Sequence, residues 1–138
     1  MQYKKSSHQN ELPISQIINK YKSSYKKFKP IYSPALNQDI QFSMPGFKHL
    51  IFKGKHRRPN KVIYSRMVLI PLIKPVIRKC NEITEIRNTT ETIKGKRLKV
   101  QYYALEARVG KSSTRVRVVV KKIGKNGEYY FQSVMKYN

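Results

Sequence analysis

The segment GFKHLIFKGKHRRPNK, residues 46 to 61, contains the residues best suited to chemistry. Two of the chain's three histidines, His49 and His56, lie there among six lysines and arginines and no acidic residue. Cationic side chains hold phosphate groups, and histidine exchanges protons near neutral pH. The segment therefore indicates contact with a polyanion. It leaves open whether the histidines act as acid and base or only help to hold that polyanion. We expect the pKa of an acting histidine at or below its ordinary value of about 6.5, because of repulsion from its neighbours Lys48, Lys53, Lys55, Arg57 and Arg58.

Residues for metal-dependent chemistry are scarce. The chain has seven acidic residues, three histidines and one cysteine, Cys80, and they form no DxD, HExxH or Cys/His spacing. The sequence also lacks a P-loop and a GxGxxG motif. We therefore expect no metal and no other cofactor. The reaction that remains is attack by the 2′-hydroxyl of RNA on its own phosphodiester, which needs a base, an acid and cations.

The charge balance supports a nucleic-acid partner. Thirty lysines and arginines face seven acids, which gives a net charge of +23. Most of these cations have no acid to pair with, so DNA, RNA or an anionic membrane surface is the expected partner. The longest apolar run, MVLIPLI at 67–73, is too short to span a bilayer. We also see no signal peptide and expect the protein to act in the cytoplasm of the producing or target cell.

The elements that must position these residues begin with a helix in SQIINKYKSSYKKFKP. Apolar residues recur there at helical spacing, Ser15 is expected to cap the helix, and Pro30 to end it. This basic amphipathic helix either packs on the domain or forms an arm for nucleic acid or a partner. Residues 30–39 contain two prolines and little periodicity, which predicts a linker. We accordingly divide the chain into a helix and linker, 1–40, and a second unit, 41–138.

The middle of the second unit is predicted to be helical. Apolar residues recur through 60–83, and Pro71 and Pro75 exclude one straight helix. We expect a helix near 60–70, a break, and a second helix near 75–82. A strand at 83–87 and then turn residues, including Gly95, should follow within 84–98.

The last third of the chain predicts a three-stranded antiparallel meander. Runs rich in valine and tyrosine at 98–109, 114–123 and 128–137 are separated by GKSS and GKNG. Alternation should place Val116, Val118 and Val120 on a face that packs against the helices. Arg115, Arg117 and Lys121 should lie on the other face, as cations without acids. The predicted fold class is α+β, with N-terminal helices packed on this meander.

The order of these features resembles the barnase–EndoU–colicin–RelE (BECR) fold, in particular its phage and polymorphic-toxin branches. The matching parts are KHLIFKGKHRRP, IYSRMVLIPLIKPVI, TRVRVVV and YYFQSVMK, which span roughly residues 45 to 138. In that superfamily a helical part carries histidine or a basic residue, and the following sheet carries Arg/Lys and Ser/Thr. The chain has no glutamate where barnase has its base, so the resemblance does not extend to the barnase type.

The resemblance implies a metal-independent endoribonuclease toxin that cuts tRNA, mRNA or rRNA and is neutralised by an acidic immunity protein or antitoxin. The implied catalytic residues are His49, His56, Arg66, Arg115, Arg117 and Ser133. The expected RNA-binding residues are Lys53, Lys55, Arg57, Arg58, Lys121, Tyr102, Tyr130 and Lys136, where rings stack on bases and cations hold phosphates. Two alternatives remain open: a non-catalytic nucleic-acid-binding module, and a basic protein that binds a partner or a membrane surface.

Overall fold

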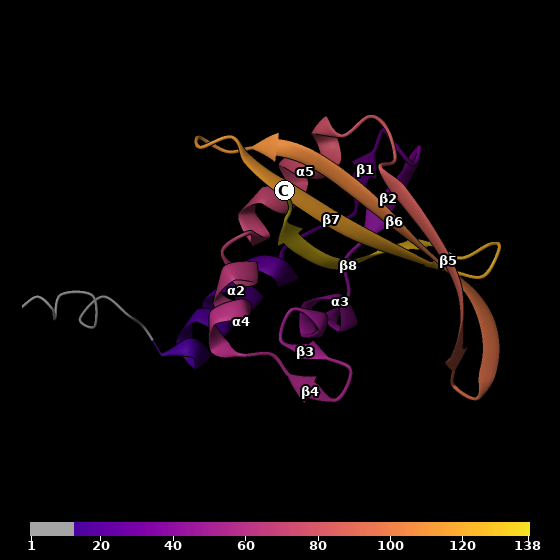
Figure 1. Cartoon of the computed structure of the whole chain (residues 1–138), viewed down its shortest axis with the longest axis horizontal. Coiled ribbons are helices and arrows are strands. Elements are labelled where there is room, and N and C mark those ends of the chain that lie inside the picture. Colours follow the sequence, from indigo (N-terminus) through magenta and orange to yellow (C-terminus); the bar gives the residue numbers. More distant parts are fainter. Residues whose placement is uncertain (1–12) are drawn as a thin grey trace, which may run out of the picture.

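A six-stranded sheet is the central element of the computed structural model, which describes residues 13–138 (Figure 1). The strand order is β1-β2-β8-β7-β6-β5, and all neighbouring pairs are antiparallel except the parallel pair β2–β8. The chain is therefore of the α+β class, as predicted. Its elements are α2 Ile14–Lys26, β1 Ile31–Ser33, β2 Gln38–Gln41, α3 Met44–His49, β3 Phe52–Lys53, β4 His56–Arg57, α4 Asn60–Met67, the 3₁₀ turn η1 Ile70–Leu72, α5 Ile73–Lys79, β5 Glu85–Ile93, β6 Lys96–Val109, β7 Thr114–Ile123 and β8 Tyr129–Lys136.

The N-terminal helix is confirmed, but its predicted cap is wrong. Ser15 lies inside the first turn of α2, and Pro13 is the N-cap residue. The Pro13 carbonyl accepts hydrogen bonds from the amides of Gln16 and Ile17, at 2.9 and 3.2 Å. Proline suits this position because its missing N–H would have no partner there. The helix contributes Tyr25 to the core, where its hydroxyl donates to the Ser43 carbonyl at 2.7 Å.

The predicted linker at 30–39 is wrong, because these residues form a hairpin. β1 and β2 pair antiparallel, and Asn37 takes the left-handed conformation in the turn between them, with φ of 54°. Ile31 and Ile40 are buried in the same core as the rest of the chain. β2 then joins the sheet at β8, so the division that we predicted after residue 40 falls within a strand.

The helical middle follows the prediction closely. Helix α4 ends at Met67, the 3₁₀ turn contains Pro71, and α5 follows directly. Pro75 does not end α5, because it lies in the first helical turn, where backbone N–H groups need no partner in the helix. Helix α5 packs against β1, β6 and β7.

The three-stranded meander is confirmed, and it is longer than predicted. Residues 84–98, expected to be mostly turn, instead form β5 and the start of β6, joined by a tight turn at Lys94 and Gly95. Both turn residues have positive φ, 51° and 79°. Three threonines, whose branched side chains favour strands, lie in β5. Figure 1 shows this hairpin bending downward beyond the end of β7.

The sheet has two different faces. The core face carries Val116, Val118 and Val120 of β7, all with 0% exposure, and packs against α5 as predicted. We call the opposite side the outer face; it carries Arg117, Val119 and Lys121. Val119 pairs with Ser133, whereas Val120 pairs with Phe131, so Gln132 is an extra residue at a β-bulge in β8. The pairing places the Ser133 side chain on the outer face.

Replacing Gly46 with alanine should lower the stability of the fold. An added Cβ would collide with the backbone oxygen of Phe131 and lie 2.9 Å from the Tyr25 hydroxyl. We expect the free energy of unfolding to fall by about 1–3 kcal/mol, because the backbone oxygen of Phe131 belongs to a paired strand and cannot move away freely. The gain in helix propensity of about 1 kcal/mol offsets only part of this. Urea unfolding of Gly46→Ala measures the change, with exposed Ser24→Ala as the control. An unchanged midpoint would contradict the close packing of α3 on β8.

Candidate active site

Three of the residues predicted as catalytic, His49, Arg66 and Ser133, lie together beside β8. Helix α3 packs against β8 and ends at His49, and α4 also contacts β8. The Arg66 Nη1 donates a hydrogen bond to the Ser133 Oγ at 2.7 Å, across 67 residues of sequence. Ser133 is 2% exposed, so this bond is shielded from water. The bond ties α4 to the last strand of the sheet.

Arg58 completes this group, because the short hairpin after α3 returns the chain to His49. Strands β3 and β4 pair, Gly54 takes a left-handed φ of 62° in their turn, and the Arg58 amide donates to the Ile51 carbonyl at 2.8 Å. The Arg58 Nε then donates to the His49 carbonyl oxygen at 3.2 Å. We call His49, Arg58, Arg66 and Ser133 the His49 cluster.

Arg58 and Arg66 are cations without an acidic partner among residues 13–138. The ion pairs in this part of the chain are Arg117 with Glu85 and Glu106, and Lys121 with Glu91. Burial lowers the pKa of both guanidinium groups, and the charge of Arg58 lowers the pKa of Arg66 further. Arginine nevertheless stays protonated in proteins. Two partly desolvated like charges therefore lie near enough to repel each other, and an anion bound near both would be stabilised.

The environment of His49 favours a neutral imidazole. Burial lowers its pKa from the ordinary 6.5, and the charges of Arg58, Arg66 and Lys121 lower it further. The buried Nδ1 has no hydrogen-bond partner among the described residues. An imidazolium ion needs an acceptor for both ring nitrogens, so the unpaired Nδ1 also disfavours the charged form. His49 can therefore accept a proton at neutral pH, as a general base must.

The sequence predicted a histidine pKa at or below its ordinary value, but for a partly different reason. We expected repulsion from Lys48, Lys53, Lys55, Arg57 and Arg58. Of these neighbours in sequence, Arg58 lowers the His49 pKa in the structure, and the main cause is burial. The other contributing cations, Arg66 and Lys121, come from α4 and β7.

Titration of His49 should show this lowered pKa directly. We expect its imidazole NMR signals to shift with a pKa below 6.5 in the folded protein. Between the folded pKa and the unfolded value the unfolded chain binds more protons, so the free energy of unfolding should rise with pH through that window. As the pH falls through it, that stability is lost. His49→Gln should remove this dependence, and a His49 pKa above 6.5 would contradict the geometry.

A row of cations and aromatic rings crosses the outer face next to the cluster. Arg87, Tyr102, Lys121 and Tyr130 occupy paired positions on four neighbouring strands, from β5 to β8. The Arg87 guanidinium lies 4.4 Å from the centre of the Tyr102 ring, and the Lys121 ammonium lies 5.6 Å from it. Tyr130 is 37% exposed. Three predicted RNA-binding residues, Tyr102, Lys121 and Tyr130, are therefore adjacent.

The outer face is not purely cationic, contrary to the prediction. Glu91 of β5 forms an ion pair with Lys121 at 3.3 Å and accepts a hydrogen bond from the Tyr102 hydroxyl at 2.5 Å. Burial and this bond raise the Tyr102 pKa, so the phenol stays neutral. Glu106 of β6 faces Arg117 in register. We did not predict either acid on this face. Glu91 lies in a segment that was expected to be turn, and the position of Glu106 opposite Arg117 depends on a strand register that was not predicted.

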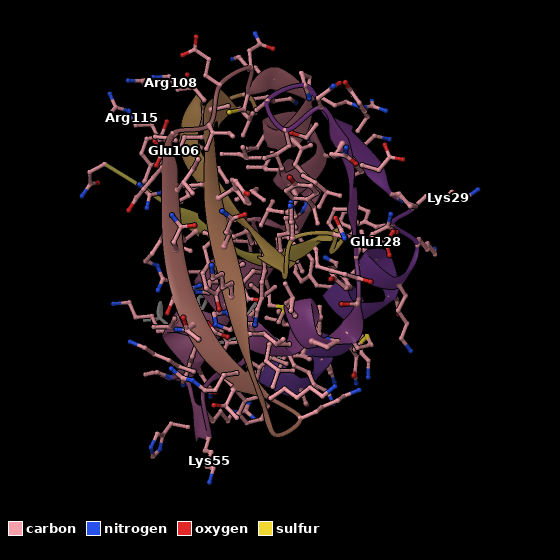
Figure 2. The ribbon with its side chains drawn as sticks, turned by 90° about the vertical axis from the view of Figure 1, so that its right-hand side faces the viewer. Lys29, Lys55, Glu106, Arg108, Arg115 and Glu128 are labelled. Atoms are coloured by element: carbon pink, nitrogen blue, oxygen red, sulfur yellow. The ribbon has the colours of Figure 1, made fainter. Side chains whose placement is uncertain are left out.

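Arg115 and Arg117 are not part of the His49 cluster. Arg117 bonds to Glu106 through Nε at 2.5 Å and lies 3.7 Å from Glu85. It is four residues from Lys121, about 13 Å along the strand, and Arg115 is about 20 Å from Lys121. Arg115 is exposed and faces Arg108 across the ladder. Figure 2 shows Arg108 and Arg115 at one end of the molecule and Lys55 at the other. The catalytic roles of Arg115 and Arg117 stay predictions.

The β3–β4 hairpin carries the remaining cations of the basic segment. Lys53, Lys55, His56 and Arg57 are all exposed there. No hydrogen bond or ion pair joins His56 to the His49 cluster within the described part of the chain. Lys136, at the end of β8, is also exposed and pairs in register with Val116. The hairpin can contact a phosphate backbone, but its histidine lacks the enclosed setting of His49.

Comparison with known proteins found no matching protein family, no matching curated protein and no matching solved structure. Within residues 13–138, no helix is long and apolar enough to cross a membrane, and no group of three histidine, cysteine or acidic side chains could hold a metal ion. The function is therefore inferred from the geometry of the site.

Proposed function

We propose that the protein is a metal-independent endoribonuclease and that the His49 cluster is its active site. One observation carries this proposal: a histidine whose environment disfavours protonation lies beside two partly buried arginines that have no acidic partner among the described residues. A base next to an anion site is the arrangement that 2′-hydroxyl attack on a phosphodiester requires. The adjoining row of Tyr102, Lys121 and Tyr130 suits the flanking nucleotides.

In the proposed reaction His49 accepts the proton of the 2′-hydroxyl. The 2′-oxygen bonds to phosphorus, the bond from phosphorus to the 5′-oxygen breaks, and that oxygen takes a proton from water. Arg58 and Arg66 stabilise the negative charge that develops on the non-bridging oxygens. Ser133 positions Arg66 by accepting its hydrogen bond. The products are a 2′,3′-cyclic phosphate and a 5′-hydroxyl.

The BECR resemblance supports the same proposal. The α+β class agrees with it, since the four strands β5 to β8 follow the helices; β1 and β2, which lie between α2 and α3, depart from the expected order. A BECR-type toxin would act on tRNA, mRNA or rRNA in the cytoplasm, and an acidic immunity protein or antitoxin would neutralise it. The net charge of +23 would attract such a partner at a high rate.

Cleavage of RNA should survive EDTA and should leave 2′,3′-cyclic or 3′-phosphate ends. The reason is that the described residues offer a base and cations but no carboxylate cluster for metal ions. End-group analysis of the cut RNA, with and without chelator, measures both features. A 3′-hydroxyl product, or loss of activity in EDTA, would exclude 2′-hydroxyl attack.

The second candidate function is a non-catalytic RNA-binding module. It is favoured by the exposed cations of the β3–β4 hairpin, which can hold phosphates without any proton transfer. The same experiment separates the two functions. RNA that is bound at saturation but stays intact would favour the binding module.

A further inference from the structure

Two adjoining pockets lie on the other side of the sheet from the His49 cluster. The first, of about 550 Å³, is lined by residues of β5, β6, the end of β7 and the β7–β8 loop, among them the polar residues Asn88, Thr90, Gln101, Lys99, Lys122 and Lys125. The second, of about 440 Å³, lies against β2 and the β7–β8 loop. They share Lys122 and Lys125, so together they can hold one extended ligand. Each falls in the size range of small-molecule sites.

The first pocket suits an anion. Lys99, Lys122 and Lys125 line it together, no acidic residue does, and none of these lysines forms an ion pair with another described residue. The Gly124 amide donates to the Lys99 carbonyl at 2.8 Å, which fixes the β7 end against β6. Three ammonium groups around one hollow favour a phosphate group, and the neighbouring hydroxyl and amide side chains can donate hydrogen bonds to it.

The second pocket has a different chemistry. The acidic residues Asp39 and Glu128 and the amide residues Gln38 and Gln41 are among those that line it. The Glu128 carboxylate also accepts a hydrogen bond from the Tyr130 hydroxyl at 3.4 Å. Carboxylates repel phosphate but accept hydrogen bonds from sugar hydroxyls and from amino groups of bases. The ring of Tyr129 forms one wall, with the Lys122 ammonium 5.2 Å from its centre. This half therefore suits an uncharged, hydrogen-bonding group attached to the phosphate.

We propose that the two pockets form a nucleotide-binding site, with the phosphate in the lysine pocket and the nucleoside in the carboxylate pocket. The lysine pocket is separate from the His49 cluster, because successive strand residues point to opposite faces: Lys121 lies on the outer face and Lys122 on the core face. The nucleotide is either free or the phosphorylated end of a nucleic-acid strand.

Binding of AMP to the whole chain, followed by NMR titration, tests this site, with adenosine, dAMP and inorganic phosphate as component probes. We expect AMP to bind at least tenfold more tightly than adenosine or phosphate, and more tightly than dAMP. Lys99→Ala/Lys122→Ala should weaken AMP and phosphate binding at least tenfold. Asp39→Asn/Glu128→Gln should weaken AMP and adenosine binding but not phosphate binding. Circular dichroism checks that each variant is folded.

The matched control is Lys61→Ala/Lys74→Ala, which removes the same charge from exposed positions of α4 and α5. It should change AMP binding less than twofold. An equal loss of AMP affinity in both double-lysine variants would show that net charge alone attracts AMP, and this would contradict the proposed site. AMP that binds no more tightly than phosphate would contradict it as well.

The source of the nucleotide is decided with DNA oligonucleotides, which the proposed ribonuclease reaction cannot cut because they lack the 2′-hydroxyl. The ligand is the end of a strand if the 5′-phosphorylated oligonucleotide binds at least fivefold more tightly than the same oligonucleotide with a 5′-hydroxyl, and if AMP displaces it. AMP binding without that difference identifies a free nucleotide. These are binding measurements, so absence of ribonuclease activity leaves their outcome unaffected, and absence of AMP binding leaves the proposed active site unaffected.

Discussion

His49→Gln should reduce RNA cleavage by about a hundredfold or more while RNA binding changes little. Glutamine fills a similar space and can still form hydrogen bonds, but it cannot accept a proton near neutral pH. Single-turnover cleavage at saturating protein, measured from pH 5 to 9, separates chemistry from binding. For the natural protein we expect the rate to rise with pH through the lowered His49 pKa and then to level. The variant should lack this rise.

His56→Gln is the matched control for this experiment. It removes the same group from the same basic segment, but from an exposed hairpin position. The sequence suggested that His56 acts as an acid or a base. In the structure, however, His49 is part of the His49 cluster and His56 is not. The control should cleave within about fivefold of the natural protein. A severe loss in His56→Gln with a mild loss in His49→Gln would reverse the assignment.

Arg66→Ala should reduce the single-turnover rate by about tenfold to a thousandfold, the range seen when one donor to a developing negative charge is removed. Arg66→Lys should recover only part of the rate, because an ammonium group cannot reproduce the two parallel hydrogen bonds of a guanidinium fork. The His49 pKa should also rise in Arg66→Ala, because the Arg66 charge lowers it in the natural protein. The acidic limb of the rate profile should therefore move to higher pH.

Two further variants distinguish catalysis from structure at Arg66. Ser133→Ala keeps the guanidinium but removes its hydrogen-bond acceptor, so its effect should be smaller than that of Arg66→Ala. Arg78→Ala removes an equal charge from an exposed position of α5 and should cleave normally. A fall in rate that simply follows the fraction of unfolded protein in Arg66→Ala would argue for a purely structural role.

The parts of the fold that follow from local pattern could be predicted from the sequence. Alternation in TRVRVVV gave the right face to Val116, Val118 and Val120, because a buried strand face permits only one register. Helical spacing likewise gave α2 and α4. The β1–β2 hairpin was missed because its strands have only three and four residues and because Pro30 and Pro34 flank β1. The full length of β5 was missed because this strand is mostly exposed and contains polar threonines and an asparagine.

The site could be predicted only in part. His49, Arg66 and Ser133 were named from residue type and from the resemblance, but their meeting depends on how α3 and α4 pack against β8. Local pattern contains no information about that contact, which spans 67 residues. Arg58 was expected to bind RNA, which stays a prediction, but its contact with His49 through the β3–β4 hairpin was not foreseen. The pairing of Arg117 with Glu106 depends on strand register, which the positions of the two residues in sequence did not give.

The long-range bond between Arg66 and Ser133 also has a consequence during synthesis of the chain. A ribosome adds about 5–20 residues per second, so roughly 3–13 seconds separate the production of these two residues. Throughout that interval α3 and α4 exist without β8, the strand that both of them contact. The basic hairpin is already present in such a nascent chain, whereas the Arg66–Ser133 contact is not. A growing chain can therefore attract RNA before its His49 cluster is complete.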